Sequence, residues 1–455
     1  MDAKNVKITG ALTKGSIYRN IWTLSWPMMI ASILRTGFSI VDMLWVGRLG
    51  PNAIAVAALS GILMFLMIAI STLVGTGTTA MVARFVGAGN SKDLQIVIKQ
   101  SIFLAIIISS LVGIIGVIFA KNILILLGAE TEVVLLGTPY IKIIFIGTPF
   151  LLLGFVISSV FRGTGDTKTP MKIMVTATTV NIILDPLLIF GIGFFPKFGV
   201  SGAAIATTFA RMVVFLMGTY ILLKGHSAVH LSLKEGFNLN FSFMKRILSI
   251  GIPSTIGLIS RNLSELALMR IVALYGTYAI AAYGIGMRVR LIAFMPCHAF
   301  SLAAAILVGQ NLGAKKPERS EKSVITSALF ATTIMGLLGV VFFIFPSQMI
   351  SIFNTNPEII KFGVSYLRIV AFAQMFVGVS MSLRGAFLGA GDTRPLMFLT
   401  IISLWMIQIP VAFFLSVYLK WGATGIWWGI AIASICEAII TTFWFRLGRW
   451  KLKKV

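Results

Sequence analysis

The sequence predicts an all-α polytopic membrane protein, with twelve transmembrane helices divided between two six-helix lobes. Hydrophobic residues make up 58% of the 455 residues and charged residues only 11%, whereas soluble proteins average about 25% charged residues. The apolar residues gather in runs of about 20, which is the length that crosses a bilayer as a helix. The second half also repeats motifs of the first, which predicts lobes related by a pseudo-two-fold axis along the membrane normal.

Twelve apolar stretches are long enough to be transmembrane helices. The first six are expected at about residues 20–47, 53–77, 96–119, 133–160, 171–194 and 199–223. The second six are expected at about residues 247–274, 279–307, 323–345, 359–383, 396–417 and 424–446. The segment between the two sets is richer in polar residues. We therefore predict an N-terminal lobe (1–223), a cytoplasmic linker (224–246) and a C-terminal lobe (247–455).

The repeat is clearest in the opening span of each half. Pro27 and Pro253 lie 226 positions apart, and Arg35 and Arg261 lie at the same spacing. Six spans in each half is an even number, so both copies enter the membrane from the same side, which makes this a parallel repeat. The two copies differ at one notable position: Asp42 in the first copy corresponds to a leucine in the second.

The distribution of basic residues predicts the orientation. The chain has 38 Lys and Arg against 14 Asp and Glu, a net charge of +24. Basic residues gather in both tails, in the linker and in the loops after spans 2, 4, 8 and 10. Because cytoplasmic loops are enriched in Lys and Arg, both termini are expected on the cytoplasmic side of the cell membrane. We attribute the charge to orientation and to attraction by anionic lipids, and we expect no nucleic-acid partner.

Glycine-rich segments in the sequence do not fit nucleotide sites. A phosphate-binding G-x-x-x-x-G-K-[ST] run is absent from the sequence. The pattern Gly75-x-Gly77-x-x-Ala80 lies at the end of an apolar span, where it indicates close helix packing. Residues 163–168 are interpreted as a tight turn, in which Asp166 and its repeat Asp392 cap the next helix. No cofactor is expected, so transport would depend on an ion gradient.

Four acids fall within the predicted spans: Asp42, Asp185, Glu265 and Glu437. A charge at bilayer depth is costly, so each is a candidate functional residue. Asn181 lies one helical turn before Asp185 and would share its face. With the carbonyl freed by Pro186, these groups could converge on one H⁺ or Na⁺. Alternatively, Asp42 and Asp185 could each pair with an intramembrane arginine.

Arg35 and Arg261 allow two interpretations. They could line a substrate cavity together with Glu265 and contact an anionic or polar substrate. They could instead pair with Asp42 and Glu265 on neighbouring turns. Glu265 lies one turn from Arg261, so we interpret it first as an ion-pair partner, and Glu437 as structural.

Several motifs resemble the multidrug and toxic compound extrusion (MATE) family of secondary transporters. They are Pro27–Gly50 with its VDMLWVGRLG ending, Gly163–Pro170, Asn181-x-x-x-Asp185-Pro186, Gly199–Thr207, Leu307–Ala314 and Gly389–Pro395. The resemblance covers nearly the whole chain. It implies two six-helix lobes in a V, alternately open to each side, that export organic and often cationic or amphipathic compounds in exchange for Na⁺ or H⁺.

The first-half acids resemble the DinF-like branch of this family. In that branch the coupling-ion site takes the positions of Asp42, Asn181, Asp185 and Thr207. The second half departs from the NorM-like branch, because Arg261 stands where that branch carries an acid. Residues 369–381 of span 10 also contain no acid.

The sequence therefore predicts a monomeric secondary antiporter for multidrug efflux, with small organic substrates and the lipid bilayer as its partners. The alternative is a flippase for lipid-linked precursors or polysaccharides, because such proteins favour arginine-lined cavities. A membrane-embedded enzyme would need a nucleophile–base pair or a metal cluster at membrane depth, and the sequence offers neither. We do not expect an enzyme.

Overall fold

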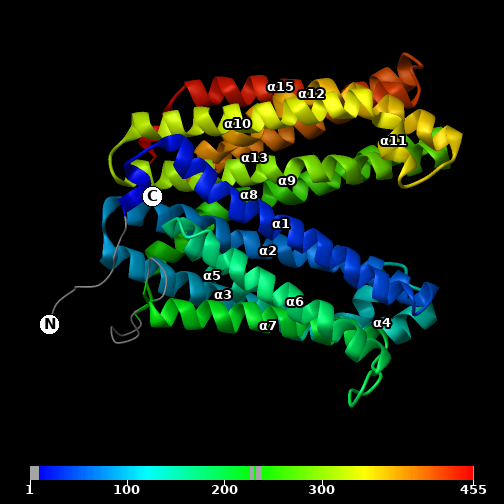
Figure 1. The fold of residues 1–455 in the computed structure, drawn as a ribbon, viewed down its shortest axis with the longest axis horizontal. Coiled ribbons are helices and arrows are strands. Elements are labelled where there is room, and N and C mark those ends of the chain that lie inside the picture. The colour runs from blue at the N-terminus through cyan, green and yellow to red at the C-terminus, as the bar shows by residue number, and fades with distance from the viewer. Residues whose placement is uncertain (1–9, 226–229, 232–237, 454–455) are drawn as a thin grey trace. The chain divides into compact units, whose positions relative to one another are not determined.

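The computed structural model describes residues 10–225, 230–231 and 238–453. Within these ranges the chain is helical and contains no strand (Figure 1). The predicted all-α membrane fold is therefore confirmed. Of the predicted linker, residues 226–229 and 232–237 lie outside the described residues, and so do residues 1–9 of the basic N-terminal tail.

The helices follow the predicted spans closely. The first half contains η1 (Gly10–Thr13), α1 (Ile17–Gly47), α2 (Pro51–Ala88), α3 (Ser91–Leu126), α4 (Thr131–Ile146), α5 (Thr148–Thr164), α6 (Lys168–Phe190) and α7 (Val200–Lys224). The second half begins with α8 (Phe241–Val272), η2 (Ala273–Tyr275), α9 (Thr277–Gly313), α10 (Pro317–Ile344), α11 (Pro346–Ser351) and α12 (Pro357–Ala390). It ends with α13 (Arg394–Ile401), η3 (Ile402–Gln408), α14 (Ile409–Phe413), η4 (Phe414–Tyr418), α15 (Ala423–Arg446) and η5 (Arg449–Leu452).

Twelve of these segments account for the twelve predicted spans. In the described ranges, ten helices are long and apolar enough to cross a membrane. One of these ten is Arg394–Tyr418, the continuous helix that consists of α13, η3, α14 and η4. The pair α4 and α5, bent by 41° at Gly147, makes an eleventh span. The twelfth is α8, which carries more polar residues than the others, among them Arg261, Asn262 and Glu265.

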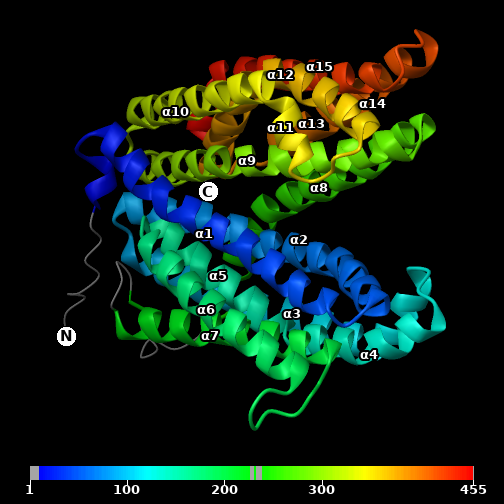
Figure 2. The same ribbon diagram turned by 45° about the vertical axis from the view of Figure 1, so that its right-hand side comes forward.

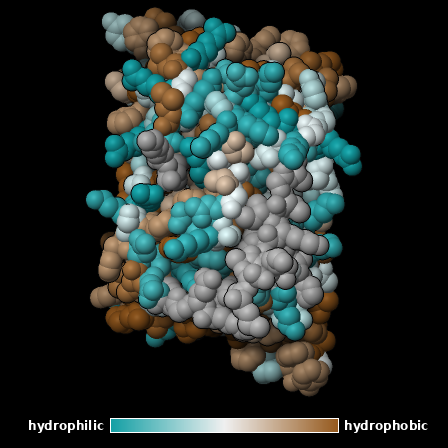
Figure 3. All heavy atoms as spheres, turned by 90° about the vertical axis from the view of Figure 1, so that its left-hand side faces the viewer, coloured by the Kyte–Doolittle hydropathy of each residue, from teal (hydrophilic) through white to brown (hydrophobic). Residues whose placement is uncertain are grey.

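The flanks of the helices are apolar, as contact with lipid requires. On α3, the side chains of Ile107, Leu111, Ile114 and Ile118 follow one another at helical spacing and are 47–65% exposed. Figure 3 looks onto one end of the helices, where hydrophilic residues gather. Apolar flanks with polar ends are the distribution that a multi-pass membrane protein needs.

The chain forms two units of internal contact. The first contains residues 26–251 and the second contains residues 11–25 and 252–455. The predicted lobe boundary lies close to this division, but the first turns of α1 and α8 go with the other half's helices. In the second unit, for example, Lys316 Nζ donates to the carbonyl of Thr13 at 3.1 Å.

Glycines allow the close helix contacts of the first unit. A Cβ atom at Gly75 would overlap the ring of Phe155 on α5, and one at Gly77 would overlap the carbonyl of Ile247. The prediction that these glycines serve helix packing is confirmed. Both views place α6 and α7 side by side (Figures 1 and 2). There Gly202 lies against the backbone of Leu188, where a larger residue would not fit.

The two predicted capping aspartates behave differently. The N–H of Thr169 donates to Asp166 Oδ1 at 3.0 Å and its hydroxyl donates to Oδ2 at 2.6 Å, so this cap is confirmed. The prediction for Asp392 is wrong, because Pro395 takes the place of Thr169 and has no N–H to donate. Asp392 instead forms an ion pair with Lys453 at 3.5 Å.

Candidate functional site

The predicted amide–carboxyl pair of α6 is present inside the first unit. Asn181 and Asp185 are both fully buried, and Asn181 Nδ2 donates to Asp185 Oδ1 at 3.3 Å. The remaining side-chain oxygens, Asn181 Oδ1 and Asp185 Oδ2, are buried and have no hydrogen-bond partner among the described residues. Two buried oxygen acceptors therefore lie next to each other with unused lone pairs.

Asp42 of α1 belongs to the same cluster. Its side chain is half-buried, and its Oδ1 atom is buried without a hydrogen-bond partner in the described part of the chain. The charges of Asp42 and Asp185 act on each other, so the two carboxyl groups lie within electrostatic range. The structure thus brings together residues that are 143 positions apart in the sequence (185 minus 42).

The fourth predicted residue, Thr207, lies on α7, which packs against α6. Its side chain is buried, with 8% exposed. Its hydroxyl makes no hydrogen bond to Asp42, Asn181 or Asp185 in the described structure. Thr207 is therefore placed on the neighbouring helix, without a hydrogen bond to the acids in the described structure.

Sequence reasoning missed Arg211, one turn after Thr207 on α7. Its side chain is 9% exposed, and its charge acts on Asp42 and on the buried Tyr140 of α4. Its Nη2 atom donates to Met64 Sδ at 2.8 Å, while Nη1 is buried without a partner among the described residues. The rule that singled out the acids, a charge inside an apolar span, would have found it.

The cluster as a whole carries an unbalanced charge. Two carboxylates and one guanidinium sum to −1 when all three are ionised. A net charge in a buried site is unfavourable, and one proton or one monovalent cation would neutralise it. Carboxylate and amide oxygens are also the ligands that hard cations prefer.

Arg35 lies elsewhere on α1, with an exposed side chain. It forms no hydrogen bond or ion pair with any described residue, so the alternative in which it pairs with Asp42 is not realised. Its charge instead acts on Arg162 of α5. Arg162 donates from Nη2 to Ser159 Oγ at 2.8 Å and lies over the ring of Phe155 at 5.4 Å.

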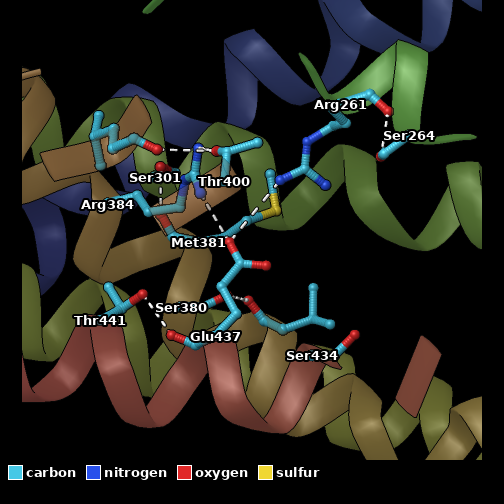
Figure 4. Close-up of polar contacts among 12 residues, drawn as sticks. Arg261, Ser264, Ser301, Ser380, Met381, Arg384, Thr400, Ser434, Glu437 and Thr441 are labelled. Carbon is cyan, nitrogen blue, oxygen red and sulfur yellow. Dashed lines mark hydrogen bonds and ion pairs between the residues drawn. The ribbon is translucent and has the colours of Figure 1, made fainter. Parts of the chain in front are cut away.

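Arg261, the equivalent residue of the second unit, has a different environment (Figure 4). Its Nη2 lies 3.9 Å from Glu437 Oε1. Arg384 of α12 donates to the same oxygen at 2.8 Å and, through Nη2, to Thr400 Oγ1 at 3.0 Å. The interpretation of Glu437 as a structural acid is supported by these contacts.

Glu265 does not pair with Arg261 as expected. No ion pair within 4.0 Å is formed by Glu265 in the described ranges, although the charges of Arg261 and Arg290 act on it. Arg290 Nη1 donates to the buried Tyr366 hydroxyl at 3.0 Å. The predicted ion pair is wrong because Glu437, a distant residue in sequence, occupies the position next to Arg261.

Helices long and apolar enough to cross a membrane, with charged groups held inside them, define a multi-pass membrane protein. The MatE family model matches residues 27–187 and 253–414. The chain therefore belongs to the MatE family of multidrug efflux transporters. The two matches begin at Pro27 and Pro253, the first equivalent positions of the internal repeat.

Individual proteins are similar to this chain over most of its length. The probable multidrug resistance protein NorM of Thermotoga maritima is 30% identical over 444 residues, covering 96% of this chain and 94% of that protein. A protein of Shewanella oneidensis, named FAD transporter, is 28% identical and covers 81% of each chain. A solved structure of a MOP superfamily transporter from Pyrococcus furiosus, described as having a binding pocket of reverse polarity, has a TM-score of 0.90, 26% identity and full coverage of both chains.

Proposed function

We propose that the chain is a secondary active antiporter that exports organic, amphipathic or cationic compounds in exchange for H⁺ or Na⁺ by alternating access. The observation that carries the proposal is the set of three buried, unpartnered oxygens: Asp42 Oδ1, Asn181 Oδ1 and Asp185 Oδ2. An unsatisfied buried polar group costs about 1–3 kcal/mol. A proton or a small cation bound among these oxygens would remove that cost.

The charge of the cluster supports exchange of one cation per cycle. With Arg211 counted, the empty site carries −1, and one H⁺ or Na⁺ brings it to zero. Arg211 and the coupling cation would then compete for Asp42, which gives the empty and the loaded site different interactions. Such a difference is what a ligand needs in order to shift a conformational equilibrium. One charge moving through 100 mV supplies about 2.3 kcal/mol.

The proposal also includes the location, oligomeric state, orientation and lobes that the sequence predicts. The protein acts in the cell membrane as a monomer with both termini in the cytoplasm, and it uses no cofactor besides the coupling ion. Residues 1–223 and 247–455 act as its two lobes, joined by the linker 224–246. Thr207 serves as a further oxygen ligand once the ion is bound, and Arg35, Arg261 and Glu265 face the substrate.

A second candidate function is a flippase for lipid-linked precursors or polysaccharides. It is favoured by Arg35, whose guanidinium is exposed and has no ion-pair partner in the described structure, because guanidinium groups suit the phosphates of such lipids. The identity of the transported molecule separates the two functions, since an antiporter moves water-soluble compounds and a flippase moves a lipid-anchored one.

The proposal is tested by transport in proteoliposomes. Efflux of ethidium is measured with a Na⁺ gradient and, separately, with a pH gradient, for the wild type, Asp42→Asn and Glu130→Gln. Glu130 is an exposed acid outside the cluster and serves as the matched control. We expect efflux to follow one gradient, to vanish in Asp42→Asn and to persist in Glu130→Gln. Equal gradient-driven efflux by all three proteins would contradict the proposal.

A further inference from the structure

An open cavity lies in the second unit, where the start of α1 meets the start of α10. Its volume is about 460 Å³, which is within the range of about 300–1,000 Å³ of small-molecule sites. One wall comes from residues 15–18 and the other from residues 319–326 of α10. Both views place the starts of the two helices side by side (Figures 1 and 2). The rings of Tyr18 and Phe330 pack edge to face, with their centroids 6.0 Å apart.

Hydrogen bonds fix the wall that the N-terminal segment forms. Arg319 Nη2 donates to the carbonyl of Lys14 at 2.9 Å and to that of Gly15 at 2.8 Å. Asn20 Nδ2 donates to the Lys14 carbonyl at 3.2 Å and to the Leu12 carbonyl at 3.3 Å. The cavity therefore has walls that specific contacts between α10 and the N-terminal segment hold in place.

The cations that line the cavity have no acid partner. Arg319 and Lys322 both line it, and neither forms an ion pair with a described residue. The carbonyls that Arg319 contacts carry no net charge, so they do not neutralise its guanidinium. Of the two acids next to these cations in the sequence, Glu321 pairs with Lys451 at 2.7 Å, and Glu318 is exposed and lines no part of the cavity. The cavity therefore attracts an anion.

An apolar surface continues from these cations along the helix. Lys322, Ile325 and Leu329 follow one another at spacings of three and four residues, so they share one face of α10. The side chains of Ile325 and Leu329 are more than half exposed. On the opposite wall, Tyr18 and Trp22 lie one turn apart on α1 and are also more than half exposed. The cavity thus joins a cationic end to an apolar face.

This combination distinguishes a lipid from a free anion. A phosphate ion in the cavity would contact Arg319 and Lys322 but would leave the apolar face uncovered. An anionic phospholipid places its phosphate at the cations and its acyl chains along the apolar face. In the orientation proposed above, the cavity lies at the cytoplasmic surface, where basic pockets between membrane helices bind anionic head groups.

We propose that this cavity binds one anionic phospholipid of the cytoplasmic leaflet. Its phosphate contacts Arg319 and Lys322, and its acyl chains follow Ile325 and Leu329. The lipid joins the start of α1 to α10 and is a bound partner of the protein, not its transported compound. The inference therefore goes beyond the proposed transport function and does not depend on the identity of the substrate.

The test is lipid binding to the full chain in detergent micelles, followed by native mass spectrometry. The probes are dioleoylphosphatidylglycerol and dioleoylphosphatidylcholine, which share their chains and their phosphate but differ in net charge. We expect the first phosphatidylglycerol to bind at least about fivefold more tightly than phosphatidylcholine, because basic residues near the membrane surface attract anionic lipids. Glycerol 3-phosphate, which lacks the chains, should not displace phosphatidylglycerol at equal concentration.

Substitutions assign the binding to the cavity. Lys322→Gln should weaken phosphatidylglycerol binding about fivefold and leave phosphatidylcholine binding unchanged, since it removes one basic residue from the head-group site. Ile325→Ser keeps both cations and should weaken the binding of both lipids, because it interrupts the apolar face. Arg319→Gln is a less direct variant, because Arg319 also holds the carbonyls of Lys14 and Gly15.

The matched control is Arg449→Gln. Arg449 is exposed and lines no part of the cavity. It lies on η5, which the Lys451–Glu321 ion pair holds beside the start of α10. The variant therefore removes one positive charge from the same end of the same unit, and it should bind phosphatidylglycerol like the wild type.

Three results would overturn the inference. The first is equal affinity of the wild type for the two lipids. The second is equal phosphatidylglycerol affinity in Lys322→Gln and Arg449→Gln, both checked for folding by their melting temperatures. The third is displacement of phosphatidylglycerol by glycerol 3-phosphate at equal concentration, which would leave an anion site without a lipid. Because no gradient or transported compound is used, these failures are separate from a failure of the proposed antiport.

Discussion

The two units of this protein repeat the same helices but treat their buried charges differently. In the second unit Arg384 and Arg261 share Glu437, and Arg290 donates to Tyr366. In the first unit the Asp42 and Asp185 carboxyl groups keep oxygens without a partner among the described residues, and Arg35 forms no ion pair there. The comparison teaches that one copy of a repeat can pair an acid inside its helices with arginines of the same unit, while the other copy leaves acid oxygens without a partner.

A pair of equivalent tyrosines makes the same point. Tyr140 and Tyr366 lie 226 positions apart, and both are buried. In the second unit the arginine beside the tyrosine comes from α9, as Arg290. In the first unit the position of Arg290 is Met64, and the arginine comes instead from α7, as Arg211. In this position on α7, the charge of Arg211 also acts on Asp42.

The largest expected effect concerns the acids. Asp185→Asn should reduce gradient-driven efflux more than about 100-fold, because it removes the fully buried carboxyl of the proposed ion site. Glu265→Gln, the comparable change in the second unit, should alter coupling by less than about threefold, since the charges of two arginines already act on Glu265. Both are measured as initial efflux rates in proteoliposomes. A larger loss of efflux in Glu265→Gln than in Asp185→Asn would contradict the difference between the two units.

A smaller effect is expected from Glu437→Gln. The variant leaves Arg261 and Arg384 without their carboxylate and should lower the free energy of unfolding by about 1–3 kcal/mol. Removal of one partner from a fully buried ion pair costs about 3–5 kcal/mol. The loss expected here is smaller because the side chains of Arg384 and Glu437 are partly exposed. Inorganic phosphate should restore part of the lost stability by replacing the carboxylate. Thermal unfolding with and without phosphate measures this, and stability equal to that of the wild type would argue against the pairing.

The smallest effect compares the two repeated aspartates. Asp166→Ala should destabilise the first unit by about 1 kcal/mol, because it removes the cap on Thr169. Asp392→Ala should cost at most about 0.5 kcal/mol, since its ion pair with Lys453 is partly exposed. Thermal unfolding of the two variants side by side gives the difference, and equal losses would show that the proline in the second copy does not matter.

The fold could be predicted from the sequence because apolar runs of bilayer length define membrane helices directly. The exception is α8, whose polar residues weaken the signal, and which is recognised mainly because it repeats α1. Asp42 and Asp185 could be found because charges inside apolar runs are rare, and Asn181 because it lies one helical turn before Asp185. Their neighbour Arg211 was overlooked, although the same rule applies to it.

Contacts between distant helices could not be predicted in this way. Glu437 follows Arg261 by 176 positions (437 minus 261), and only the packing of α8, α12 and α15 brings Arg261, Arg384 and Glu437 together. A neighbour four residues away, Glu265, was the natural partner in sequence. The local rule failed because helix spacing fixes which residues share a face but does not fix which helix lies opposite.

The central claim is that the first unit, and not the second, binds the coupling cation. The most direct measurement is the number of cations bound per chain in nanodiscs, from calorimetric titration with Na⁺ and from proton titration, for the wild type, Asp185→Asn and Glu265→Gln. We predict one Na⁺ or one additional H⁺ per wild-type chain, none in Asp185→Asn and one in Glu265→Gln. Cation binding that survives in Asp185→Asn and disappears in Glu265→Gln would contradict the account.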